Sequence, residues 1–83
     1  MLITKRFQRR FKRLPLHVQP RIVDAIETLA MEEDPTRISK KLRGNRYGQY
    51  SYRIGNYRII YDIVRDEIIV LRFIEVGARR SIY

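Results

Sequence analysis

Basic side chains give this 83-residue chain its clearest chemical character. The chain has eighteen lysines and arginines but only nine acidic residues, which gives a net charge of +9. Seven of the basic residues lie between Arg37 and Arg58, and no acid follows in the sequence until Asp62. Because guanidinium groups bind phosphates through paired hydrogen bonds, this stretch predicts a polyanionic partner and favours RNA. The alternative is that the charge serves solubility alone.

The distribution of charge favours the functional interpretation. Residues 5–13 hold six further basic residues, whereas five of the nine acids lie between Asp24 and Asp34. Separated blocks of opposite sign produce a directed field. The chain has no cysteine, which excludes disulfides, zinc thiolates and cysteine nucleophiles. Its one histidine, His17, is expected to be a surface or packing residue, and we expect neither a metal nor a cofactor.

The length allows a single domain, residues 1–83. No apolar stretch is long enough to span a bilayer, and the chain becomes charged at Lys5, so we expect no membrane partner and no signal peptide. The absence of cysteine agrees with a reducing cytoplasm. We therefore expect a cytoplasmic protein.

Apolar residues recur at helical spacing in the first part of the chain. Thr4 is placed to cap a first helix, which Leu14-Pro15 ends. A second helix follows with Pro20 near its start, and Asp34-Pro35 is expected to end it. Leu2-Ile3 could add a short strand before the helices.

From Tyr47 the apolar period changes to two, which predicts three strands that end near Ile54, Val64 and Val76. The turn candidates are Gly55-Asn56 and Arg65-Asp66. The expected fold class is α+β, with two N-terminal helices packed on one face of a small antiparallel β-sheet.

The first turn predicts how the two strands beside it pair, and this pairing decides which side chains could form a binding site. If Gly55-Asn56 is the whole loop, Arg53 lies directly opposite Arg58 on one face of the sheet, which we call the arginine face. Opposed like charges are destabilising, so the pair indicates an anion between them. The alternative is that both side chains splay to solvent or pair with Asp62 and Glu75. We expect further residues on this face, namely Ser51, Ile60, Ile69, Leu71 and Phe73. The core face is expected to carry Tyr52, Ile54, Tyr57, Ile59, Tyr61, Val70 and Ile74.

Three elements in order resemble the RelE/ParE toxin superfamily over essentially the whole chain. They are Lys41-Leu42-Arg43-Gly44, the core Tyr52-Arg53-Ile54-Gly55-Asn56-Tyr57-Arg58-Ile59-Ile60-Tyr61, and the ending Val76-Gly77-Ala78-Arg79-Arg80 that closes at Tyr83. The resemblance implies a RelE-like fold and the toxin of a toxin–antitoxin pair. A RelE-like toxin is expected to be an endoribonuclease that cleaves mRNA on the ribosome through the RNA's own 2′-hydroxyl and that a cognate antitoxin neutralises.

The same resemblance implies catalytic roles for Arg58, Arg79, Tyr83 and Arg53. Arginine can stabilise the charge that builds on a phosphoryl group. It cannot act as a general base, because its guanidinium group stays protonated. Tyr83 either takes a proton, if nearby cations lower its pKa, or stacks on a base. The expected RNA-binding residues are Lys40, Lys41, Arg43, Arg46 and Arg80.

Two positions depart from the family pattern and bear on activity. Ser51 stands where nucleases of this family often have a lysine, and Ala78 stands where histidine or lysine is frequent. Tyr83 is also the last residue, so its carboxylate adds negative charge beside the expected site. Two alternatives therefore remain open: a ParE-like toxin that inhibits DNA gyrase by binding, and a non-enzymatic RNA-binding module.

Overall fold

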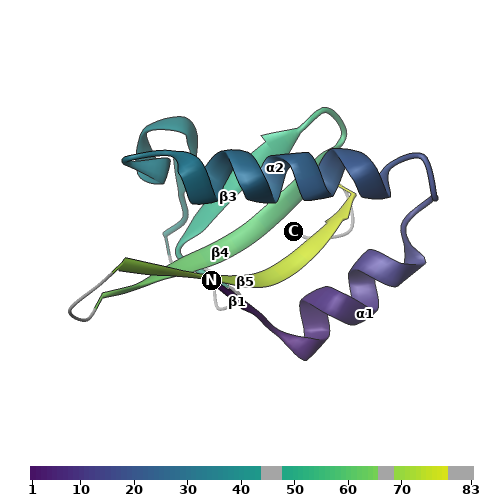
Figure 1. Ribbon diagram of the computed structural model, residues 1–83, viewed down its shortest axis with the longest axis horizontal. Coiled ribbons are helices and arrows are strands. Elements are labelled where there is room, and N and C mark those ends of the chain that lie inside the picture. Colours follow the sequence, from purple (N-terminus) through teal and green to yellow (C-terminus); the bar gives the residue numbers. More distant parts are fainter. Residues whose placement is uncertain (44–47, 66–68, 79–83) are drawn as a thin grey trace.

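The computed structural model describes residues 1–43, 48–65 and 69–78. Two helices precede most of the sheet, and short strands extend the sheet at both edges (Figure 1). The elements are, in order, β1 (Leu2–Ile3), α1 (Lys5–Arg13), α2 (Gln19–Met31), the short 3₁₀ helix η1 (Pro35–Ile38), β2 (Lys40–Lys41), β3 (Tyr50–Ile54), β4 (Tyr57–Arg65) and β5 (Ile69–Ala78).

The strand order in the sheet is β1-β5-β4-β3-β2. Strands β3, β4 and β5 form the expected antiparallel meander, and α2 runs across β3 and β4 while α1 lies beside β5 (Figure 1). The predicted α+β fold is confirmed, with one correction. The sheet is mixed because β1 pairs in parallel with β5, and β2 adds an antiparallel edge strand that the sequence did not indicate.

The helix boundaries follow local signals. The Thr4 hydroxyl accepts the backbone N–H of Phe7 at 3.1 Å, as predicted, and it also donates to the carbonyl of Ile74 at 3.1 Å, which ties the start of α1 to β5. Helix α2 ends at Met31, three residues before the predicted stop. Asp34 instead caps η1, where its carboxylate accepts the backbone N–H of Thr36. No helix in the described ranges is long and apolar enough to cross a membrane.

The core lies between the helices and one face of the sheet. Phe7 of α1 meets Phe73 of β5 with ring centroids 5.9 Å apart, and Tyr61 of β4 lies 6.0 Å from the same ring. The predicted core residues Tyr52, Ile54 and Tyr57 pack against this core as partly buried side chains. The buried members are Phe7, Val18, Ile22, Ala25, Ile26, Leu29, Ile59, Tyr61, Leu71, Phe73 and Val76.

The register between β4 and β5 differs from the predicted one. Tyr61, expected on the core face, pairs with Phe73, which was expected on the arginine face. Directly opposed residues lie on the same face, so this part of β5 is turned over relative to the prediction. Leu71 and Phe73 are therefore in the core. The second residue of the turn candidate Arg65-Asp66 lies outside the described ranges.

A β-bulge then exchanges the faces of β5 a second time. Ile60 pairs with Glu75 and Tyr61 pairs with Phe73, so Ile74 is the extra residue. Ile74 was expected in the core, but it lies with Ile60 beneath Gly48, since a Cβ at Gly48 would be 2.6 Å from Ile60 Cγ2 and 3.3 Å from Ile74 Cδ1. The bulge thus places Glu75 on the arginine face.

Candidate functional site

The β3–β4 hairpin positions Arg53 and Arg58 as predicted. Gly55 has a φ of +57° and begins the two-residue turn, so Ile54 pairs with Tyr57 and Arg53 lies directly opposite Arg58. The two guanidinium groups point in different directions. Arg53 Nε donates to the carbonyl of Gly55 at 3.0 Å, while Arg58 Nη1 donates to Ser51 Oγ at 3.4 Å. This divergence reduces the repulsion of two opposed like charges.

Arg58 is the more enclosed of the two arginines. Its side chain is half-buried and its Nε atom is screened from solvent, whereas Arg53 is exposed. Ser51, which accepts its hydrogen bond, is buried, and the residue opposite Arg58 on β5 is Gly77, which carries no side chain. A charge in such a place acts through a lower dielectric than one in open solvent. Among the described cations on this face, Arg58 is therefore the one whose charge solvent screens least.

Lys40 shares the arginine face. It is the Cα partner of Ser51 across the β2–β3 pair, and directly opposed residues in a sheet lie on the same side. Its neighbour Lys41 pairs with Tyr50, a residue packed against the core, and so belongs to the other face. Both lysines are exposed. The structure therefore separates two lysines that the sequence treated alike.

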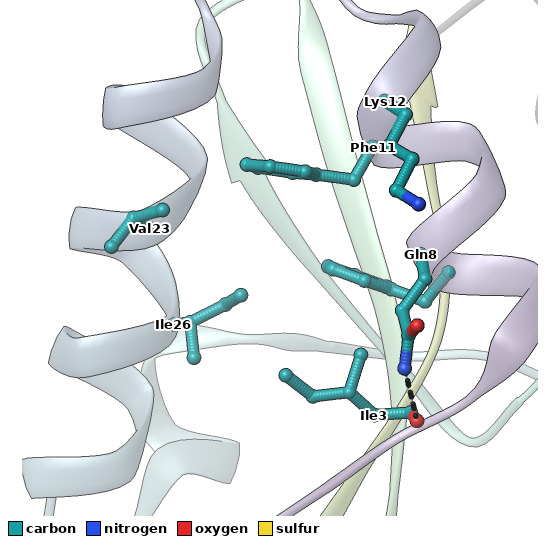
Figure 2. A pocket seen from close by; sticks show the side chains of 7 residues that line it. Ile3, Gln8, Phe11, Lys12, Val23 and Ile26 are labelled. Carbon is teal, nitrogen blue, oxygen red and sulfur yellow. Dashed lines mark hydrogen bonds between the residues drawn. The ribbon is translucent and has the colours of Figure 1, made fainter.

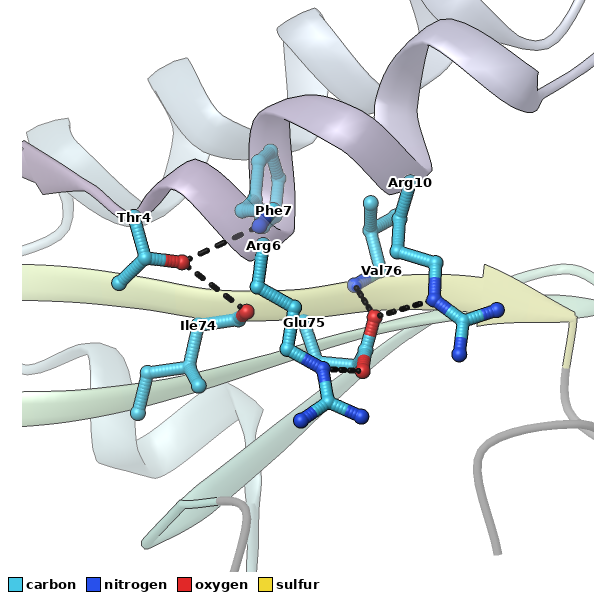
Figure 3. A network of polar contacts seen from close by, with 7 residues as sticks. All are labelled: Thr4, Arg6, Phe7, Arg10, Ile74, Glu75 and Val76. Atoms are coloured by element: carbon cyan, nitrogen blue, oxygen red, sulfur yellow. Dashed lines mark hydrogen bonds and ion pairs between the residues drawn. The ribbon is translucent and has the colours of Figure 1, made fainter.

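Glu75 has a role that the sequence analysis did not identify, because it binds two arginines of α1. Its side chain is 5% exposed, and its two carboxylate oxygens meet Arg6 Nε at 2.7 Å and Arg10 Nε at 3.4 Å (Figure 3). The alternative considered above, in which acids pair with the hairpin arginines, named Glu75 and Asp62. In the structure, Asp62 binds Arg72 at 2.9 Å. The one signal in the sequence was an acid between Ile74 and Val76 in an apolar run.

The remaining predicted residues fall in two groups. Arg43 follows β2 and is exposed. Arg46, Arg79, Arg80 and Tyr83 lie outside the described residues, so their roles stay predictions. In the part of the chain that the structure describes, no three histidine or acidic side chains come together as a metal site would require.

An apolar groove lies between the two helices, away from the arginine face (Figure 2). Its volume is about 210 Å³, and α1 contributes its aromatic wall while α2 contributes Val23 and Ile26. Ile3 and Val23 are exposed at its mouth, and Lys12 and Gln8 form a polar rim. Among the residues expected to offer apolar area to a partner on the arginine face, Leu71, Phe73 and Ile60 are buried. Two exposed apolar side chains, Ile3 and Val23, lie at this groove instead.

A mixed sheet with helices on one face and cations on the other defines a small basic α+β protein. Residues 1–83 match the family model of the ParE toxin of the type II toxin–antitoxin system parDE. The chain therefore belongs to this family, within the RelE/ParE superfamily of type II toxins.

Individual relatives agree with the family match. The chain is 34% identical over 86 residues to Toxin RelG of Mycobacterium tuberculosis (strain ATCC 25618 / H37Rv), covering 100% of this chain and 98% of that protein. It resembles the toxin in the RelB–RelE antitoxin–toxin complex of Methanococcus jannaschii with a TM-score of 0.69 and 32% identity, over 100% and 95% of the two chains. For the RelBE2 complex of M. tuberculosis the TM-score is 0.64 and the identity 31%, over 93% of each chain.

Proposed function

We propose that this toxin is a metal-independent endoribonuclease that cleaves mRNA on the ribosome and is neutralised by a cognate antitoxin. The observation that carries the proposal is the setting of Arg58, a half-buried guanidinium held by Ser51 with Lys40 on the same face. In-line attack by a 2′-hydroxyl builds negative charge on the phosphoryl oxygens, and a fixed guanidinium stabilises that charge. Arg58 has this role in the proposed mechanism.

Arg79 and Tyr83 complete the proposed mechanism as predictions from the family pattern. Arg79 would share the phosphate with Arg58, and Tyr83 would take the 2′-hydroxyl proton or stack on a base. Arg53 and Arg43 would hold the flanking backbone through exposed guanidinium groups. Ribosome and mRNA are the proposed partners of this face.

The test is cleavage of mRNA on translating ribosomes. Arg58→Ala is expected to slow cleavage by about 10²–10³-fold, the usual cost of removing one donor that stabilises transition-state charge. Thermal unfolding of the same variant checks that the fold is retained. If wild-type toxin leaves translated mRNA intact, the nuclease proposal is wrong.

Lys40 allows a sharper test with a matched control. Lys40→Ala removes an ammonium from the arginine face, whereas Lys41→Ala removes the same charge from the neighbouring position on the other face. We expect Lys40→Ala to slow cleavage at least tenfold and Lys41→Ala to have little effect. Equal losses in the two single variants would show that only total charge matters.

The match to the ParE family model favours a second candidate, a toxin that inhibits DNA gyrase by binding. Inhibition of gyrase supercoiling with intact mRNA would support this candidate. In a third outcome, the protein neither cleaves mRNA nor inhibits gyrase, but it binds RNA with an affinity that depends on Arg58. That result would indicate a non-enzymatic RNA-binding module. In that case and in the nuclease case, RNA affinity should fall steeply with salt.

For the antitoxin we propose the groove between α1 and α2 as the docking site. The groove is lined by apolar side chains, and its rim on α1 is basic, with Lys12 at the groove and Lys5 and Arg9 exposed on the same helix. An amphipathic segment with acidic flanks would complement both features. The two similar structures named above are complexes of a toxin with an antitoxin, which supports such a partner.

The groove can be tested without disturbing the core. Val23→Glu changes an exposed residue at its mouth, and Met31→Glu makes the same change at an exposed position at the end of α2. Val23→Glu should weaken antitoxin binding, measured by calorimetry with the purified cognate antitoxin, at least tenfold more than Met31→Glu. Equal affinities would exclude the groove as the docking site.

A further inference from the structure

A basic hollow lies where the end of α1 meets the ends of the β4–β5 pair. Its volume is about 250 Å³. Arg10 and Arg13 of α1 form one wall, Leu14 and Pro15 continue it, and Tyr57 with the β5 residues around Gly77 forms the other. Among the described residues that line the hollow, these two arginines are the charged ones.

The side chains of this hollow suit a nucleotide. Arg10 and Arg13 are both exposed, three positions apart on α1, so their guanidinium groups can meet one phosphate. Glu75 contacts Arg10 through Nε, and the outer end of the Arg10 guanidinium points away from that carboxylate (Figure 3). Tyr57 is half-buried, which fixes its ring and leaves an aromatic surface on which a base can stack.

The hollow borders on the site of Arg58. Gly77 lines the hollow and is also the residue paired with Arg58. Tyr57 and Arg58 are consecutive in β4, so their side chains point to opposite faces at the same end of the sheet. A single strand of RNA held at Arg58 therefore has a second basic and aromatic surface at the neighbouring positions of the same two strands.

From these contacts we infer that Arg10, Arg13 and Tyr57 form a second nucleotide subsite for single-stranded RNA. The two arginines hold a phosphate that flanks the one at Arg58, and Tyr57 stacks on the adjoining base. Glu75 is a positioning residue for Arg10. This inference rests on the proposed function only in taking RNA as the ligand.

The test measures binding of a short fluorescein-labelled 2′-O-methyl oligoribonucleotide, which cannot be cleaved, by fluorescence anisotropy. The variant is Arg10→Gln with Arg13→Gln, and the control is Arg9→Gln with Lys12→Gln, which removes the same charge from the same helix outside the hollow. We expect the first pair to weaken binding at least tenfold more than the second. The slope of log affinity against log salt should also fall by about 0.7 for each lost phosphate contact, as for single strands. Equal losses and equal slopes in the two pairs would overturn the subsite.

Two further variants keep the test independent of stability. Arg13→Gln alone leaves both ion pairs of Glu75 in place, so loss of α1 packing cannot explain its effect. Tyr57→Leu keeps an apolar side chain but removes the ring, and we expect at least a fivefold loss of affinity. If both single variants bind the oligonucleotide as tightly as the wild-type protein, the subsite is refuted.

Cleavage on ribosomes separates this inference from the proposed function. Suppose that the wild-type toxin cleaves mRNA and that the variants bind RNA and cleave mRNA as well as it does, for Arg10, Arg13 and Tyr57 alike. The subsite is then refuted, while the nuclease proposal is supported. If nothing is cleaved but the oligonucleotide affinities differ as expected, the nuclease fails and the subsite stands.

Discussion

The ion pairs of Glu75 predict a measurable contribution to stability. Glu75→Gln keeps the shape of the side chain and removes its charge. The contact with Arg6 Nε at 2.7 Å then changes from an ion pair to a hydrogen bond between a guanidinium and a neutral amide. Hydrogen bonds to charged groups contribute about 1.5–3 kcal/mol, and the amide keeps part of this because Arg6 stays charged, so the expected loss is about 1–2 kcal/mol.

Two effects keep the loss near the lower end of that range. The contact with Arg10 is longer, at 3.4 Å, and both arginine side chains are nearly half exposed, so solvent screens them. Removing a buried carboxylate also removes the free-energy cost of its desolvation. For a domain of this size, the loss corresponds to a melting temperature lower by about 5–10 °C.

The assay is thermal and urea unfolding followed by circular dichroism. Arg6→Gln should cost more than Arg10→Gln because its contact is shorter, and Arg9→Gln, whose side chain pairs with no acid among the described residues, is the matched control. A double-mutant cycle between Arg6 and Glu75 should give a favourable coupling free energy. If Glu75→Gln unfolds at the same or a higher temperature, the carboxylate does not stabilise the fold, and α1 is held by its apolar packing and by the Thr4 hydrogen bond to β5.

Three other substitutions test the packing around the site. Burial raises the pKa of the Tyr61 phenol, so above about pH 10 the unfolded chain ionises first and stability falls as pH rises. Tyr61→Phe should flatten that fall in urea titrations across this range, and an unchanged fall would assign it to other groups. Gly48→Ala places a Cβ 2.6 Å from Ile60 Cγ2 and should cost about 1–3 kcal/mol of unfolding free energy. Gly55→Ala should cost about 1–2 kcal/mol because φ is +57° there, and an unchanged urea midpoint in either variant would contradict the packing described.

The sequence predicted those parts of the fold that local signals control. Thr4 caps α1, and Gly55-Asn56 forms the whole turn of the first hairpin, so the pairing of Arg53 with Arg58 was correct. The turn between β4 and β5 has no comparable glycine signal, and the alternation of apolar residues in β5 fits either face. Leu71 and Phe73 were therefore assigned to the wrong side.

Contacts between distant residues were beyond such reasoning. Glu75 and Arg6 are 69 positions apart, and they meet because a bulge in β5 turns Glu75 to the arginine face while Thr4 fixes α1 beside the same strand. The face of Lys40 depends on the two residue pairs that join β2 to β3. Neither the bulge nor the short strand leaves a periodic pattern that the sequence could reveal.

The two departures from the family pattern illustrate how tertiary structure changes their meaning. Ser51 lacks the lysine expected at its position, but it holds Arg58 through its hydroxyl and lies directly opposite Lys40 on the next strand. Ala78 lacks the basic residue that is frequent at its position, but it lines the same hollow as Arg10 and Arg13. Each missing cation thus has a cation from another element nearby. We therefore expect Lys40 of β2 and the two arginines of α1 to supply positive charge near these positions, so that neither departure by itself excludes an active site.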